Sequence, residues 1–260
     1  MPHFVASACA ICKVLPRRRV GAIAVTHRIL QLLAFLALIA LPLTPALSQT
    51  AERAPDTMAA RVLACASCHG AEGEGTSDVY FPRLAGKPAG YLYNQLVAFR
   101  DGRRKYPPMN YLLEFLPDAY LKQIAEHFAS LRPPFPPPAV PTVSNEILAR
   151  GEQIATQGDP QRGIPPCAAC HNSTFGGMEP AIPGLLGLRA SYISGQLGGW
   201  RYGTRTAIAP DCMQIVAGLL TEDDVKAVAA FLSSRPAPAD PSFAKRGSLP
   251  MPLACGSEPN

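Results

Sequence analysis

The stretch CASCH, from Cys65 to His69, returns 102 residues later as CAACH, from Cys167 to His171. Both copies follow the pattern C-x-x-C-H, which sets two thiols on one side of a helical turn and an imidazole directly after them. This pattern is the attachment sequence of c-type haem. The sequence therefore predicts two covalently attached haem c groups, each with its iron on a histidine. The residues predicted to hold them are Cys65, Cys68 and His69, and Cys167, Cys170 and His171.

Two other uses of paired cysteines fit less well. Zinc ribbons separate their two C-x-x-C pairs by about 15–20 residues, whereas these two pairs lie nearly a hundred residues apart. A thioredoxin-like dithiol belongs to a βαβ unit, and no such pattern surrounds either motif. Covalent haem is the interpretation that both copies support.

The residues after each motif repeat as well. The segment FPRLAGKPAGYLYNQLVAFRDGRR (Phe81–Arg104) aligns with IPGLLGLRASYISGQLGGWRYGTR (Ile182–Arg205). A period of this length is too long for a solenoid and predicts two tandem domains. Matched positions include Pro82 and Pro183, Gly86 and Gly187, Tyr91 and Tyr192, Gln95 and Gln196, Leu96 and Leu197, and Gly102 and Gly203.

The first 48 residues differ from the rest of the chain. They hold five of the 24 lysines and arginines, none of the 19 acidic residues, and the apolar run ILQLLAFLALIAL (Ile29–Leu41). Prolines and the small-residue sequence ALS (Ala46–Ser48) follow. This order is typical of a signal peptide, so we expect residues 1–48 to be cleaved near Ser48 or Gln49 and the protein to be periplasmic. An uncleaved anchor is the alternative, although the run of 13 residues is shorter than the roughly 20 of a spanning helix.

Beyond these residues the charges balance, which excludes a nucleic-acid-binding surface. The run LRPPFPPPAVP (Leu131–Pro141) contains six prolines and favours an extended, semi-rigid spacer. An SH3-type ligand is the competing interpretation. The expected organisation is a first domain at 49–132, a proline-rich linker at 133–143, a second domain at 144–236 and a tail at 237–260.

Strand signals are scarce, so we expect an all-α fold. The expected helices lie near 57–65, 89–101 and 118–131 in the first half, and near 145–158, 190–202 and 221–234 in the second. Thr221 followed by Asp224 has the form of a capping box at the start of the last helix.

A methionine follows each repeat, in a segment that we expect to be a loop. Met109 lies 40 residues beyond His69, and Met213 lies 42 residues beyond His171. Thioether sulfur favours ferrous iron, so His/Met ligation raises the reduction potential of a haem. Most methionines only fill a core, but their equivalent positions favour Met109 and Met213 as axial ligands. His127 is the other histidine beyond the first 48 residues that could ligate iron, but we expect it at the solvent-exposed edge of the last helix of the first half.

At this point the sequence resembles the cytochrome c4 family of dihaem cytochromes. The resemblance rests on CASCHG and GIPPCAACH, on PRLAG and PGLLG, on the two aligned segments, and on CMQIVAGLLTEDDVKAVAAFL (Cys212–Leu232), and it covers about Pro55–Arg235. It implies two class I cytochrome c domains facing each other, each with one His/Met haem. It also implies that the carbonyls of Pro82 and Pro183 orient the two histidine rings.

The resemblance further implies a periplasmic carrier of single electrons rather than an enzyme. Its partners would be redox proteins, namely a bc1-type complex or dehydrogenase as donor and a terminal oxidase or other acceptor, with any membrane association through those partners. The alternatives are the electron-transfer subunit of a dehydrogenase complex and an enzyme in its own right, a dihaem peroxidase or a thiosulfate dehydrogenase. We expect no catalytic residues.

Cys212 and Cys255 depart from the family pattern. They are the two cysteines left outside the haem motifs once the first 48 residues are removed. In an oxidising compartment two leftover thiols suggest a disulfide that fastens the tail near the second haem. The sharper alternative is that Cys212 itself ligates iron, as in dihaem thiosulfate dehydrogenases.

Overall fold

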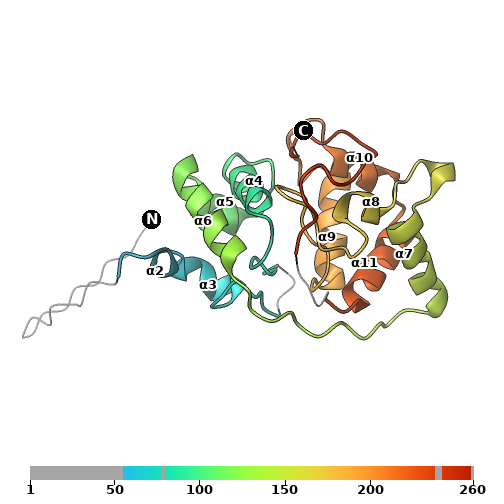
Figure 1. The fold of residues 1–260 in the computed structure, drawn as a ribbon, viewed down its shortest axis with the longest axis horizontal. Coiled ribbons are helices and arrows are strands. Elements are labelled where there is room, and N and C mark those ends of the chain that lie inside the picture. The colour runs from blue at the N-terminus through green and yellow to red at the C-terminus, as the bar shows by residue number, and fades with distance from the viewer. Residues whose placement is uncertain (1–54, 78–79, 238–241, 259–260) are drawn as a thin grey trace, which may run out of the picture. The chain divides into compact units, whose positions relative to one another are not determined.

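The computed structural model describes residues 55–77, 80–237 and 242–258, so the predicted leader lies outside the described residues. In the described parts, helices are joined by irregular segments and the only β-structure is a set of isolated bridges. The all-α fold predicted from the sequence is confirmed. The first half contains α2 (Met58–Arg61), α3 (Leu63–His69), α4 (Ala89–Arg100), α5 (Pro107–Leu113) and α6 (Asp118–Ser130). The second contains α7 (Asn145–Gln157), the 3₁₀ turn η1 (Pro160–Arg162), α8 (Cys167–His171), α9 (Ala190–Arg201), α10 (Cys212–Leu219) and α11 (Glu222–Ser234) (Figure 1).

Each half has its own apolar core. In the first half α4 packs on α6, whose buried positions recur at i, i+3, i+4 and i+7 from Leu121, the stripe of an amphipathic helix. In the second half α7 packs on α11. The first core is built from Val62, Leu92, Phe99, Leu113, Leu121, Ile124, Ala125 and Phe128. The second includes Ile154, Ala155, Ile164, Ile193, Leu197, Val228, Ala229, Phe231 and Leu232.

The contact between α7 and α11 requires a glycine. A Cβ atom on Gly151 would collide with the backbone carbonyl of Ala227 and with the side chain of Phe231. The two helix backbones therefore approach more closely there than any larger residue allows.

The first predicted helix was wrong in its boundaries. We expected one helix over 57–65, but the backbone leaves helical geometry at Val62 (φ −95°, ψ 11°), and α3 then continues to His69. The whole first C-x-x-C-H motif is thus helical, as the second is in α8. Gly70 ends α3 with φ +87°, a conformation that glycine adopts without steric cost.

The prediction that both methionines lie in loops was also wrong. Met109 lies in α5, which begins with Pro107 and Pro108, and proline is well tolerated in the first turn of a helix. Met213 lies in α10, where the side chain of Asp211 caps the helix by accepting from the Gln214 N–H. These short helices fix the two side chains more firmly than loops would.

The proline-rich segment is extended and contacts both halves. The Arg83 guanidinium donates to the carbonyls of Pro133 and Pro134 and lies 4.2 Å from the centroid of the Phe135 ring. Further along, the Ala139 N–H donates to the Ser233 carbonyl. The spacer is therefore held by contacts with the first half near its start and with the second half further along.

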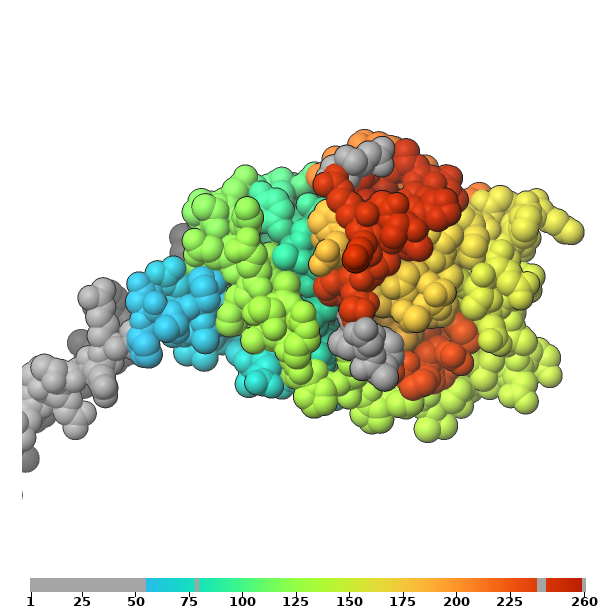
Figure 2. Space-filling model, viewed as in Figure 1, coloured from blue at the N-terminus to red at the C-terminus, as the bar shows by residue number. Residues whose placement is uncertain are grey.

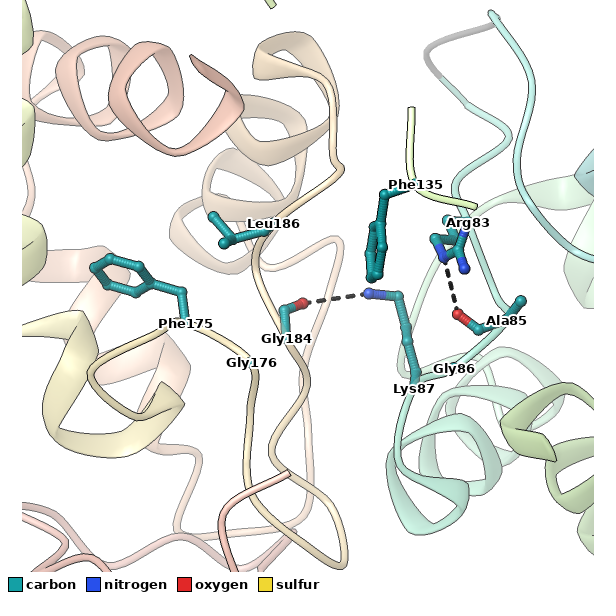
Figure 3. Close-up of a pocket in the computed structure, with 9 residues that line it drawn as sticks. All are labelled: Arg83, Ala85, Gly86, Lys87, Phe135, Phe175, Gly176, Gly184 and Leu186. Atoms are coloured by element: carbon teal, nitrogen blue, oxygen red, sulfur yellow. Dashed lines mark hydrogen bonds between the residues drawn. The ribbon is translucent and has the colours of Figure 1, made fainter. Parts of the chain in front are cut away.

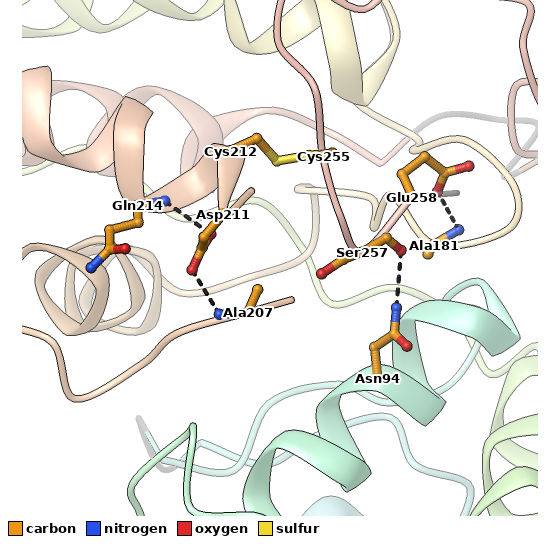
Figure 4. The surroundings of a disulfide bond; sticks show 9 residues. All are labelled: Asn94, Ala181, Ala207, Asp211, Cys212, Gln214, Cys255, Ser257 and Glu258. Carbon is orange, nitrogen blue, oxygen red and sulfur yellow. Dashed lines mark hydrogen bonds between the residues drawn. A yellow bond between two sulfur atoms is a disulfide. The ribbon is translucent and has the colours of Figure 1, made fainter. Parts of the chain in front are cut away.

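The C-terminal residues are fastened to the second half. The predicted disulfide between Cys212 and Cys255 is present, with the Cα atoms 5.0 Å apart, within the usual range for a disulfide. Three residues further on, the Glu258 carboxylate accepts from the Ala181 N–H at 2.9 Å (Figure 4). Figure 2 shows the deep red C-terminal residues lying across the yellow and orange surface. We call residues 253–258 the C-terminal strap.

The start of α11 is a buried polar network. Thr221 and Asp224 form the predicted capping box. The Asp224 carboxylate also accepts from Arg150 and from Arg162, at 3.1 and 2.7 Å. Burial raises the pKa of Asp224, but the Thr221 and arginine hydrogen bonds outweigh it and lower the pKa to about 2. The charged carboxylate therefore ties α7, η1 and α11 together.

No helix in the described segments is both long and apolar enough to cross a membrane.

Asp224→Asn should reduce the free energy of unfolding by about 2 kcal/mol at neutral pH, because the charged acceptor is lost. The folded pKa is depressed, so this stabilisation is present above the unfolded value of about 3.9 and is lost as the pH falls through about 2. Chemical denaturation of the holoprotein, followed by circular dichroism, measures it. Asp223→Asn, an exposed acid in the same turn, is the control and should change stability by less than about 0.5 kcal/mol. Equal losses in both variants would contradict the network.

Cys255→Ser should destabilise the second half, because the disulfide closes a loop of 43 residues. The chain-entropy model gives at most about 4 kcal/mol for such a loop. Cys212→Ser should cost the same amount, and the double variant should cost no more than either single one, as measured by thermal unfolding. Additive losses would show that the two sulfurs act separately.

Candidate functional site

The first C-x-x-C-H motif lines a large apolar cavity in the first half. Cys65 and Cys68 project from α3, and His69 at its end is 7% exposed. The Nδ1 atom of His69 lies 2.9 Å from the carbonyl oxygen of Pro82, so the ring donates through Nδ1 and keeps Nε2 free to accept or to ligate. Met109, from α5, lines the same cavity.

The second motif builds the same arrangement. Cys167, Cys170 and His171 line a second apolar cavity together with Met213 of α10. His171 is also 7% exposed, and its Nδ1 lies 2.7 Å from the carbonyl oxygen of Pro183. Both predicted proline contacts are therefore present in the structure. Each cavity brings together two thiols, one oriented imidazole and one thioether.

The four motif cysteines, Cys65, Cys68, Cys167 and Cys170, take part in no disulfide among the described residues. Burial raises the pKa of the Cys167 thiol to about 12 and also raises the pKa values of Cys65 and Cys170. Burial likewise lowers the pKa values of both histidines, which favours the neutral imidazole that binds metals. The group that these residues suit is apolar and makes bonds to sulfur and to nitrogen.

The other candidate ligands lie elsewhere. His127 packs edge-on against Phe128 on α6 and does not line the first cavity. Cys212 lines the second cavity, but its sulfur is bonded to Cys255. The alternative of a free Cys212 thiolate on iron is therefore contradicted, because a disulfide sulfur carries no thiolate charge.

A polar seam joins the two cavities, and it has a near-symmetric design. The Arg104 guanidinium donates to Gln95 of its own half and to Tyr192 and Gln196 of the other, over 2.6–3.1 Å. The Arg205 guanidinium donates to Gln196 of its own half and to Tyr91 and Gln95 of the other, over 2.8–3.3 Å. We call these six residues the arginine seam.

The backbone and the aromatic rings follow the same symmetry. Arg104 and Arg205 form an isolated antiparallel bridge. Arg104 lies 4.5 Å from the centroid of Phe99, and Arg205 lies 3.7 Å from that of Trp200. Matched residues of the two repeats thus meet each other across the seam.

The seam carries positive charge without a matching acid. Within the described segments, neither Arg104 nor Arg205 forms an ion pair with a carboxylate, and Arg205 is 5% exposed. Burial raises the pKa of Tyr91, but the charges of Arg205, Arg104 and Lys87 outweigh it and lower the pKa to about 8. A buried cation needs a partner. Haem fits on both counts, because it is an apolar macrocycle with two carboxylates, and residues of the seam line both cavities.

The seam was not predicted from the sequence, although its signal was there. Tyr91, Gln95 and their partners were matched across the repeat, and Arg104 and Arg205 end the two aligned segments. Polar residues kept in both copies at helical spacing, together with the arginine that follows each helix, point to a shared polar surface.

The comparisons with known proteins agree with this geometry. Residues 57–123 match the cytochrome c family. The chain is 36% identical over 172 residues to the thiosulfate dehydrogenase electron acceptor of Thiomonas intermedia, covering 66% of this chain and 78% of that one. It is 34% identical over 199 residues to cytochrome c4 of Pseudomonas aeruginosa, covering 75% of this chain and 96% of that one.

A solved structure shows the same fold. The crystal structure of reduced cytochrome c4 from Pseudomonas stutzeri matches with a TM-score of 0.59 and 29% identity, over 68% of this chain and 96% of that one. The duplicated cavities, the two attachment motifs and this coverage lead to one conclusion. The chain belongs to the cytochrome c4 family of dihaem, electron-transferring c-type cytochromes.

Proposed function

We propose that this protein carries single electrons between redox proteins of the periplasm, using one haem c in each half. The observation that carries the proposal is the pair of like cavities joined by the arginine seam. When bound, haem iron supplies the one-electron chemistry. The chain holds the macrocycles, orients the histidines and keeps water away from the irons.

Cys65, Cys68, Cys167 and Cys170 would form the thioether bonds to haem, and His69 and His171 would each bind one iron. Met109 and Met213 would be the second protein ligands, a role supported by their presence in the cavities of the matching histidines. With two protein ligands on each iron there would be no open position for a substrate, so we propose a carrier without catalytic residues.

The organisation proposed from the sequence goes with this function. Residues 1–48 would be a signal peptide removed near Ser48, which delivers the chain to the compartment where its disulfide is stable. The domains would span 49–132 and 144–236, with the linker at 133–143 and the tail at 237–260. The two separate cores support this division.

The donor that we favour is a dehydrogenase. The relative from Thiomonas intermedia is described as a thiosulfate dehydrogenase electron acceptor, which supports a similar partner here. A terminal oxidase or another acceptor would then take the electrons. A bc1-type complex is the alternative donor, supported by the likeness to cytochrome c4.

Replacing one of the two proposed methionine ligands should change the midpoint potential of one haem only. Met109→His and Met213→His should each lower one of the two midpoint potentials, because a second imidazole favours ferric iron more than a thioether does. We expect a fall well beyond about 59 mV, the shift for a tenfold change in a one-electron equilibrium. Potentiometric titration of the haem absorbance measures both steps. Met178→Leu is the control, since Met178 is buried in the second half away from both cavities, and it should leave both potentials in place. Unchanged potentials in a methionine variant would remove that residue from the ligand set.

The donor is tested by mixing. The oxidised holoprotein should be reduced rapidly by a purified thiosulfate dehydrogenase supplied with thiosulfate, and not by either component alone, as followed by absorbance in a stopped-flow instrument. Reduction by thiosulfate alone would instead favour an enzyme. No reduction with the complete mixture would leave a quinol-oxidising complex as the donor to be tried in the same assay.

A further inference from the structure

Lys87 breaks the symmetry between the halves. In the aligned segments the arginine seam pairs Tyr91 with Tyr192, Gln95 with Gln196, and Arg104 with Arg205. The position that matches Lys87 is Leu188. Lys87 lines both haem cavities and is 9% exposed. Lys87 therefore adds a buried cation beside the arginine seam, and the second half has an apolar leucine at the matching position.

The Lys87 side chain crosses from the first half to the second. Its Nζ donates to the carbonyl of Gly184 at 3.2 Å (Figure 3). Gly184 directly follows Pro183, whose carbonyl accepts from Nδ1 of His171. A cation of the first domain is thus fixed one residue from the group that orients the second histidine.

The backbone around Gly184 has little room to move. A Cβ atom on Gly184 would lie 2.7 Å from the Gly176 carbonyl oxygen, and one on Gly177 would lie 2.7 Å from the Gly184 nitrogen. The Lys87 bond therefore acts on a tightly packed loop, and its loss would be transmitted to Pro183.

The residue of the first half that matches Gly184 makes different contacts. Arg83 corresponds to Gly184, and its guanidinium is turned to the carbonyls of Ala85, Pro133 and Pro134 and to the Phe135 ring. From the second half the exposed Arg189 donates to the Thr76 carbonyl at 3.4 Å, but among the described contacts no buried cation of that half reaches the loop of the first histidine. Burial lowers the pKa of Lys87, and the carboxylates that haem would bring to the cavities would favour the charged form of this lysine.

We propose that Lys87 is a positioning residue of the first domain that makes the two haem sites unequal, by holding the Pro183–Gly184 loop against His171 and by placing a positive charge beside it. A nearby cation favours the less positive, reduced state of the iron. The second site is thereby raised in potential relative to the first, and electrons are drawn toward the second domain. The inference rests on the proposed ligation of the second iron by His171 and Met213.

The test compares Lys87→Met, which keeps the length and apolar stem, with Lys87→Arg, which keeps the charge. The two midpoint potentials are measured by potentiometric titration of the holoprotein. They are assigned by repeating the titration in the Met109→His and Met213→His backgrounds. Lys87→Met should lower the second potential so that the equilibrium constant for electron transfer from the first site to the second falls about tenfold, or about 59 mV. Lys87→Arg should keep the equilibrium constant close to that of the unaltered protein, because the positive charge is retained.

Lys122→Met, at an exposed lysine of α6, is the control for the loss of one formal charge and should leave the ratio unchanged. The inference would be overturned if neither midpoint potential changed in Lys87→Met, or if both fell by the same amount. Lys87 would then be only a structural contact between the halves. Lys87→Gln serves the same purpose if the methionine variant does not fold. If Met213→His moves neither potential, the proposed ligation fails, and that outcome is distinct from a failure at Lys87.

Discussion

The structure depends on two guanidinium groups, the buried Arg205 and the half-buried Arg104, which form no ion pair with an acid among the described residues. Arg104 and Arg205 each bond to side chains of both halves, so neither half completes its own polar surface. Leaving such charges unpaired in a buried seam costs several kcal/mol. The anions that suit the site are the carboxylates of the cofactor. Each half therefore needs the other half and the haems to satisfy its arginine, and a half on its own would expose that arginine to solvent.

The need for haem also explains how two such small apolar cores can keep the halves folded. Each half holds a handful of short helices around one apolar cluster, and domains of this size are marginal on side-chain packing alone. A covalently bound macrocycle adds a large apolar surface to each cavity wall. The linker bonds, the polar network at Asp224 and the disulfide add the rest, each from a different part of the chain.

Much of this could be predicted from the sequence, because the chemistry is local. C-x-x-C-H needs only five adjacent residues. The resemblance to the family implied the histidine contacts with Pro82 and Pro183, which lie 13 and 12 residues beyond His69 and His171. The capping box at Thr221 is local too. The short helices around Met109 and Met213 were missed, since proline and small apolar runs carry weak helix signals. The seam was missed because it forms between helices distant in sequence, and periodicity within one helix says nothing of its partner.

The C-terminal strap has a consequence for the second cavity. Leu253, Cys255 and Ser257 line the second cavity, and the Asn94 amide of the first half donates to the Ser257 carbonyl. Cys167 and Cys170 of the second attachment motif line this same cavity, and so does Cys212, the disulfide partner of Cys255. The disulfide therefore holds part of the wall of the second cavity in place, and Asn94 joins that wall to the first half.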